Sequence, residues 1–291
     1  MKHSSVLIVG CGDIGIRTGG LLMAQGWDVA GVRRDSSKLP AGFVAYAANY
    51  TQPASLNFIE RLEPDFVLAT FNPADRTPAG YKAGFQTAMS HLISGLGSHR
   101  PRHTLMVSST RVFAEARGGW VDDDSPLTND DPCALAIITA EQQLLASGHN
   151  ASVVRFAGIY GIPGSRLISR VRRGDLCHPE PVSYTNRIHR ADCAGFLAHL
   201  LQLVDAGKTI KRLYTGVDDE PAPRYEVEAW LARAMGLEVL PQQKVPASVD
   251  QSTERGGSGH KRCRNKALHD SGYQLIYPDY KSGYTALLAQ N

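Results

Sequence analysis

The stretch of sequence that most constrains the fold is residues 6–34, where an apolar run leads directly into a glycine-rich loop. The apolar run, residues 6–9, is typical of a parallel strand that is buried on both faces. The loop, residues 10–15, has the spacing G-x-G-x-x-G and opens a helical pattern that ends at Gly26, before residues 27–32 become extended. A glycine loop flanked by these elements predicts a dinucleotide-binding site.

Each residue of this loop has an expected role in holding a dinucleotide. Gly10 permits the tight turn, Gly12 lets the backbone approach a pyrophosphate, and Gly15 lets the helix lie close to the strand. The N-terminus of the helix, at Asp13 and Ile14, is expected to offer backbone N–H groups to the phosphates. We therefore predict that these five residues bind the cofactor.

The residues after the second strand bear on the choice of cofactor. Folds that select NAD place Asp or Glu there to bind the ribose 2′-hydroxyl, whereas this chain has Arg33 and Arg34, followed by Asp35. Two guanidinium groups suit a 2′-phosphate because they form charge-assisted, forked hydrogen bonds. The sequence favours NADP, and Asp35 keeps NAD as the alternative.

Further along the chain, strand-like and helix-like segments alternate. Strands are predicted at residues 43–46, 66–70, 104–108 and 151–156, and helices at residues 55–62, 81–96 and 134–145. This alternation predicts an α/β fold with a doubly wound parallel sheet, the Rossmann fold, and a ligand crevice at the carboxyl ends of the strands. We expect residues 1–157 to form the dinucleotide-binding domain. Residues 158–291 are expected to supply the last sheet elements and a smaller substrate-binding cap.

Composition narrows the class of protein further. The 291 residues carry a formal net charge of +3, which is too mild to indicate nucleic acid, and the basic run at residues 261–266 has no interleaved aromatic residue. The five cysteines form no CxxC pair, which predicts reduced thiols in the cytoplasm and no metal site. No apolar run reaches membrane-spanning length, and the N-terminus enters the first strand with no room for a signal peptide.

Four later segments carry a resemblance to a known family. Residues 107–113 resemble an "SS-x-x-VYG" strand end, residues 121–127 an acidic "E-x-x-P" loop, residues 153–161 an "LR-x-x-x-VYG" strand, and residues 186–192 an "R-x-x-H-V-x-D" segment. Together with the glycine loop, they resemble the extended short-chain dehydrogenases/reductases of the NAD-dependent epimerase/dehydratase type, particularly the atypical members. The resemblance implies a small-molecule substrate, such as a nucleotide sugar, and it is compatible with an oligomer.

The resemblance also implies a catalytic Tyr and a Lys four residues later, on the helix after the acidic loop. In this chain those positions fall on Cys133 and Ile137. Cys133 is then either a small buried helix residue or a catalytic thiol. Ser109 matches the family's Ser or Thr beside the reacting oxygen. Other polar residues could supply the missing acid and base, among them Tyr81, Lys82 and Arg111.

The segment at residues 186–192 supplies candidate substrate-binding residues. Arg187 lies where the family approaches its substrate diphosphate, and His189 has either an acid/base role or a structural one. Asp192 is expected to cap a helix at residues 194–204. Two functions stay open at this point: an NAD(P)-dependent epimerase, dehydratase or reductase acting on a sugar-like or anionic molecule, and a non-catalytic NAD(P)-binding sensor or regulator.

Overall fold

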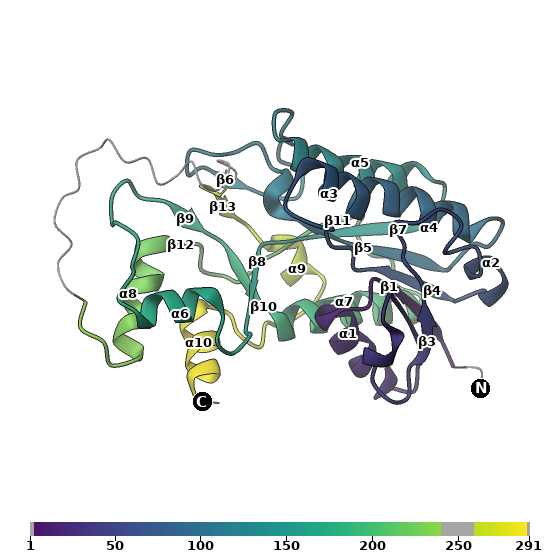
Figure 1. Cartoon of the computed structure of the whole chain (residues 1–291), viewed down its shortest axis with the longest axis horizontal. Helices are drawn as coiled ribbons and strands as arrows, with labels where there is room; N and C mark the ends of the chain where they lie inside the picture. The colour runs from purple at the N-terminus through teal and green to yellow at the C-terminus, as the bar shows by residue number, and fades with distance from the viewer. Residues whose placement is uncertain (1–2, 240–258, 290–291) are drawn as a thin grey trace.

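Seven parallel strands form the central sheet of the computed structural model, which describes residues 3–239 and 259–289 (Figure 1). In spatial order they are β11 (Leu213–Gly216), β7 (Ala151–Phe156), β5 (His103–Ser109), β4 (Phe66–Ala69), β1 (Ser5–Val9), β2 (Asp28–Arg33) and β3 (Val44–Ala47). Every neighbouring pair is parallel, so all the carboxyl ends lie at one edge. The predicted α/β doubly wound fold is confirmed.

Helices cover both faces of this sheet. One face carries α1 (Asp13–Met23), α7 (Arg190–Asp205) and α9 (Lys266–Asp270), and the other carries α3 (Pro78–Tyr81), η2 (Lys82–Thr87), α4 (Ala88–Leu96) and α5 (Pro132–Ala146). Successive residues of β1 alternate between the two cores: Val6 and Ile8 pack with α7, whereas Leu7 and Val9 pack with α4 and α5. Among the described residues, no helix has both the length and the apolar character needed to cross a membrane.

Two of the predicted helices differ from the structure, one in its length and the other in its helix type. Of residues 55–62, only α2 (Ile59–Leu62) is helical, and the residues before it form turns in which the Ser55 hydroxyl donates to the Asn49 carbonyl at 2.7 Å. Local side-chain hydrogen bonds of this kind compete with helix formation. Residues 81–96 are helical throughout, but η2 is a π-helical turn immediately after Tyr81.

The remaining elements form a second layer beside the carboxyl edge of the sheet (Figure 1). This cap contains β8 (Gly158–Tyr160) paired with β10 (Arg187–His189), β9 (Tyr184–Thr185) paired with β12 (Ala222–Pro223), α6 (Arg166–Arg172), α8 (Arg224–Ala234) and α10 (Tyr280–Leu288). Its apolar core includes Tyr160, Val171, Leu231 and Tyr284. A short parallel pair, β6 (Trp120–Val121) with β13 (Arg262–Cys263), brings the late chain back against the loops that follow β5.

Asp192 does not cap a helix, so that prediction was wrong. Helix α7 begins earlier than expected, and the His189 side chain caps it by accepting the Ala191 N–H at 3.2 Å. The buried Asp192 carboxylate instead accepts the backbone N–H groups of Ile276 and Tyr277 at 2.7 and 3.1 Å. Asp192 therefore ties the C-terminal segment to the first turn of α7.

Candidate functional site

The three glycines of the loop between β1 and α1 have different surroundings. Gly10 has a φ of +82°, and a Cβ there would lie 2.7 Å from the Thr70 carbonyl oxygen. A Cβ on Gly15 would lie 2.8 Å from the side chain of Ile8, so this glycine brings α1 close to the sheet. A Cβ on Gly12 would meet only the Gly10 carbonyl, at 3.7 Å. The fold itself therefore leaves space at Gly12, as a cradle for a pyrophosphate requires.

The N-terminus of α1 faces this cradle without a side-chain cap. Gly12 is the N-cap residue and has no side chain to accept the first N–H groups of the helix. Asp13 points away into an ion pair with Arg17 at 3.1 Å and a longer one with Arg190 at 3.6 Å, and the half-buried Ile14 packs against the core. The exposed amides and the helix dipole suit a phosphate group.

Two arginine side chains, those of Arg33 and Arg34, lie at the carboxyl end of β2. Arg33 is half-buried and Arg34 is exposed, and neither side chain makes a hydrogen bond or ion pair with another described residue. Asp35 is already occupied, because it accepts the Ser37 hydroxyl at 2.6 Å and pairs with Lys38 at 3.3 Å. These contacts lower the pKa of the Asp35 carboxyl. This strand end thus presents two arginine side chains together with a carboxyl group that is already hydrogen-bonded.

The carboxyl end of β5 carries a polar cluster that we call the β5 cluster: Tyr81, Ser109, Arg111, Asp131 and Cys133. The Arg111 guanidinium makes a forked ion pair with Asp131, with Nε–Oδ2 at 2.6 Å and Nη2–Oδ1 at 3.1 Å. Its Nη1 lies 3.4 Å from the Tyr81 hydroxyl. The Ser109 hydroxyl oxygen accepts the Arg111 N–H at 3.2 Å, and Asp131 also accepts the Cys133 N–H at 3.0 Å.

Helix α5 carries buried Cys and Ile side chains at the two positions where the family resemblance implies a Tyr and a Lys. Cys133 is 6% exposed, and Ile137 is 1% exposed within the core between α4, α5 and the sheet. One turn later, Glu141 is buried in an ion pair with Arg155 at 2.7 Å and accepts the Ser108 hydroxyl. The assignment of Cys133 and Ile137 to the Tyr and Lys positions stays a prediction, and both side chains contribute mainly to packing.

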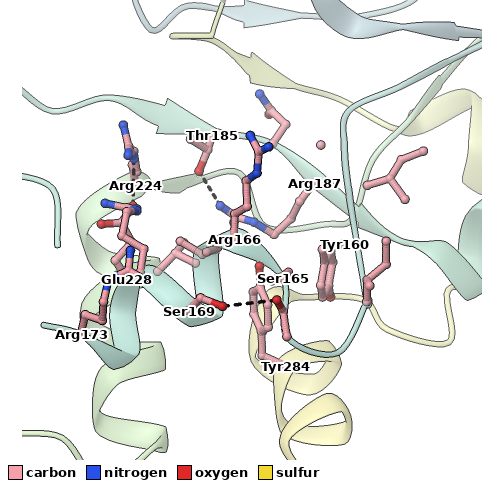
Figure 2. A pocket seen from close by; sticks show the side chains of 18 residues that line it. Tyr160, Ser165, Arg166, Ser169, Arg173, Thr185, Arg187, Arg224, Glu228 and Tyr284 are labelled. Atoms are coloured by element: carbon pink, nitrogen blue, oxygen red, sulfur yellow. Dashed lines mark hydrogen bonds and ion pairs between the residues drawn. The ribbon is translucent and has the colours of Figure 1, made fainter. Parts of the chain in front are cut away.

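The cap holds a cavity of about 720 Å³ beside β8, β10 and α6 (Figure 2). Five arginines line it: Arg166, Arg170, Arg173, Arg187 and Arg224. Glu228 is the only acidic residue of the lining, and it pairs with Arg170 and with Arg224, the latter at 2.9 Å. The other three arginines form no ion pair with any described residue, so the cavity has an excess of positive charge.

Arg187 is the least exposed of these arginines, at 7%. Its Nη2 donates to the Thr185 hydroxyl, but its buried Nη1 has no hydrogen-bond partner among the described residues (Figure 2). Nearby, burial raises the pKa of Asp218 to about 8, although the Arg187 charge opposes this shift. Burial therefore favours the uncharged form of Asp218, which weakens its compensation of the Arg187 charge. A buried donor without a partner is costly unless a ligand satisfies it.

His189 lies beside the cavity but is held in a structural position. Its ring packs against Tyr160 and Tyr277, with ring centroids 5.2 and 4.2 Å apart, and its Nδ1 caps α7. Burial, together with the positive charge of Arg190, lowers its pKa to about 4. The side chain is thus neutral near pH 7, and a substrate-binding role for His189 stays a prediction.

Sequence reasoning missed three functional candidates. Asp131 precedes Pro132 at the start of α5, and this Asp-Pro pair is a helix-start signal that could have identified its capping role. No local pattern identified Asp218 as a functional candidate, and Lys261 was noted only as part of the basic run at residues 261–266. Lys261 is buried and donates to the carbonyls of Thr110 and Phe113 at 3.2 and 3.5 Å. These residues lie so far from Lys261 in the sequence that no local pattern predicts the contact.

Within the described ranges, no group of three or more His, Cys, Asp or Glu side chains is arranged to hold a metal ion.

Comparisons with known proteins agree with this geometry. No model of a protein family matches the sequence. A Methylobacillus flagellatus protein classed with the NAD-dependent epimerases/dehydratases is 34% identical, with 99% of each chain covered and a TM-score of 0.83. A 3-diazoavenalumate denitrifying reductase from a Streptomyces species is 27% identical over 96% of this chain and 98% of its own. The UDP-glucose 4-epimerase of Thermotoga maritima, solved with UDP-glucose, is 16% identical and shares the fold, with a TM-score of 0.79 over 98% of this chain and 97% of its own.

The raised pKa of Asp218 predicts a pH-dependent stability. Between the ordinary value of 3.8 and about 8, the folded protein keeps a proton that the unfolded chain has lost, so the free energy of unfolding falls as pH rises through this window. The slope from this group is at most about 1.4 kcal/mol per pH unit. Asp218→Asn should remove that slope in urea unfolding from pH 5 to 8. The same change at the exposed Asp28, at the start of β2, is the control, and parallel curves for wild type and Asp218→Asn would contradict the assignment.

Proposed function

Because this chain belongs to the NAD-dependent epimerase/dehydratase family of extended short-chain dehydrogenases/reductases, we propose that it is an enzyme that uses NADP to transform an anionic small molecule. The main support for a cofactor site is the open space at Gly12, beside the N-terminus of α1, which has no side-chain cap. Gly10, Asp13, Ile14 and Gly15 complete the proposed contact with the pyrophosphate.

NADP is favoured over NAD by the charges at the carboxyl end of β2. Arg33 and Arg34 lie at the position that approaches the adenosine ribose, and neither side chain is paired with another described residue, whereas Asp35 is bound to Ser37 and Lys38. When bound, the nicotinamide supplies or accepts a hydride. This chain's own residues orient the two ligands and move the proton.

The substrate we propose carries a phosphate or diphosphate group, as a nucleotide sugar does. Support comes from the cavity in the cap, where, among the described residues, the buried Nη1 of Arg187 has no hydrogen-bond partner and Arg166 and Arg173 have no acidic partner. Arginine suits such a ligand because its planar fork donates two parallel hydrogen bonds to phosphate oxygens. The cavity size of about 720 Å³ is in the range of small-molecule sites.

A non-catalytic sensor of NAD(P) is the second candidate, and the packing of α5 favours it. Cys133 and Ile137 are buried and supply no phenol and ammonium pair. The two candidates differ in one measurable respect, because only an enzyme consumes or regenerates the cofactor in the presence of a substrate. The β5 cluster, with Ser109 and Arg111 at its centre, supports the enzyme.

Gly12→Val tests the cofactor site. A Cβ at Gly12 would contact the protein only at the Gly10 carbonyl oxygen, at 3.7 Å, and the valine side chain that extends from it would occupy the proposed pyrophosphate position. Isothermal calorimetry should detect NADP binding to wild type and none to Gly12→Val. Gly20→Val is a matched control in α1, because a Cβ at Gly20 would have no neighbour within 4 Å outside the adjacent backbone of the helix itself. Equal NADP affinity for all three proteins would rule out this site.

The double variant Arg33→Ala/Arg34→Ala tests the preference for the 2′-phosphate. Loss of a charge-assisted contact should cost about 1.5–3 kcal/mol of NADP binding, which is roughly a 10- to 150-fold increase in Kd. The Kd for NAD should stay within about twofold of its wild-type value, because NAD has no 2′-phosphate. Calorimetric titrations with both cofactors give the comparison. A parallel loss of both affinities would mean that these arginines hold the fold and do not select the cofactor.

Arg166→Ala tests the proposed anion site in the cap. UDP is the probe, and its affinity measured by calorimetry should fall about 10-fold, the effect of one charge-assisted hydrogen bond. Arg172→Ala, also an exposed arginine of α6 but outside the cavity lining, is the control and should bind UDP as wild type does. If both variants lose the same affinity, the effect comes from the overall charge of α6 and not from a site.

A further inference from the structure

The β5 cluster contains a phenol and a cation that the proposed cofactor and anion sites do not use. Tyr81 comes from the end of α3, Arg111 from η3 (Thr110–Val112), and Asp131 from the N-cap of α5. We propose that Tyr81 exchanges the proton with the substrate oxygen, and that Arg111, held by Asp131, stabilises the charge on the phenol oxygen. This inference rests on the proposed function, because the proton transfer accompanies hydride transfer.

The geometry of Arg111 suits this role. Its forked ion pair with Asp131 leaves Nη1 as the guanidinium nitrogen nearest the Tyr81 hydroxyl, at 3.4 Å. The same guanidinium lies over the Tyr81 ring, 5.1 Å from its centroid. The Arg111 side chain is 28% exposed and that of Asp131 is 19% exposed, so the pair is partly shielded from water. A fixed cation beside a phenol favours the negatively charged form of the oxygen during proton transfer.

The position of Tyr81 in the fold brings it to the proposed crevice. It follows β4, the strand next to β1, and the residue after β4, Thr70, donates its hydroxyl to the Gly10 carbonyl at 2.9 Å. Its partner Arg111 follows Ser109 at the end of β5, the next strand of the sheet. The chain therefore connects the glycine loop to Tyr81 and Ser109 through two adjacent strand ends, where ligands of doubly wound sheets bind.

Two further features fix the cluster. The buried Lys261 anchors η3 by donating to the carbonyls of Thr110 and Phe113, at the two ends of this turn. The π-helical turn η2 begins directly after Tyr81, and a Cβ on Gly84 of this turn would lie 2.3 Å from the Asn72 carbonyl oxygen. The tight contact locks the turn against the segment that follows β4. Rare π turns recur at functional sites, where they re-aim a side chain.

The proton balance of the step is simple. In the direction of reduction, the carbonyl carbon of the substrate gains a hydride, whose two electrons come from the reduced cofactor that the proposed function supplies. The carbonyl π pair moves to the oxygen, which takes the proton from Tyr81 Oη and becomes an alcohol. The electron pair of the broken O–H bond stays on Oη beside Arg111, and water returns a proton to it. The Ser109 hydroxyl can donate to the same substrate oxygen.

Cys133 is the alternative proton donor that the family resemblance implies. Its thiol belongs to a side chain that is 6% exposed, whereas the Tyr81 side chain is half-buried and contacts a cation. The Cys133 N–H donates to Asp131, so its backbone helps to hold the carboxylate that orients Arg111. Cys133 is then a positioning residue, and Tyr81 is the catalytic one.

The test compares single-turnover rates of NADPH oxidation with dihydroxyacetone and dihydroxyacetone phosphate, and epimer formation from UDP-glucose. Tyr81→Phe should lower the rate by about 100-fold or more, the usual contribution of a general acid, with the Kd for NADPH unchanged by calorimetry. Tyr46→Phe is the matched control, because Tyr46 lies on β3 and stacks on Phe58 away from the cluster. Arg111→Met should lower the rate, and Arg111→Lys should restore part of it.

The outcomes distinguish failure of the proposed enzymatic function from failure of the proton relay. If wild type converts none of the three probes, the proposed enzymatic function fails and this inference fails with it. If wild type turns over a probe and Tyr81→Phe keeps that rate, the proton relay alone is wrong. Loss of turnover in Cys133→Ser with normal turnover in Tyr81→Phe would assign the proton to the thiol instead.

A readout that needs no turnover is the reactivity of Tyr81 with tetranitromethane, which attacks the charged form of a phenol. Peptide mass spectrometry should find Tyr81 nitrated several-fold more slowly in Arg111→Met than in wild type, with Tyr46 as the internal reference. An unchanged rate at Tyr81 would mean that Arg111 does not stabilise the phenol oxygen, and it would overturn the relay.

Discussion

The parallel pairing of β1 with both β2 and β4 is the constraint on which the candidate site depends. The chain leaves β1 through α1 toward β2, whereas β4 and β5 extend the sheet in the other direction. In doubly wound sheets, ligands bind where the connections diverge in this way, at the carboxyl ends of the strands. The glycine loop, Thr70 and the β5 cluster all lie at this edge, so that one topological feature brings together residues from separate parts of the sequence.

The C-terminal chain completes this edge through contacts that span most of the molecule. Asp192 binds the backbone of residues 276 and 277, and Lys261 binds the turn that follows Ser109. Both side chains are buried, and each satisfies more than one backbone group, which makes them costly to replace. The cap is therefore joined to the sheet by buried polar side chains as well as by its apolar core, and Arg187 of the same region lines the cavity.

The sequence predicted those features that depend on neighbouring residues. The strand, loop and helix of residues 6–34 and the buried strand at residues 151–156 follow from local patterns, and the structure contains them. The helix expected at residues 55–62 is mostly turn because Ser55 and Asn49 hydrogen-bond locally. The capping role expected of Asp192 depended on a helix boundary that was four residues late. Contacts such as Lys261 with Thr110, 151 positions apart, have no local pattern, and neither has the pairing of Arg111 with Tyr81.

The most direct test of the account is a crystal structure of the protein with NADP. The account predicts electron density for the pyrophosphate on the amides of α1, for the 2′-phosphate beside Arg33 and Arg34, and for the nicotinamide ring on the side of Ser109 and Tyr81. Tyr81 Oη should then lie within hydrogen-bond reach of a carbonyl oxygen positioned at the nicotinamide C4. A nicotinamide ring seated with Tyr81 out of reach, or a cofactor bound away from the glycine loop, would contradict it.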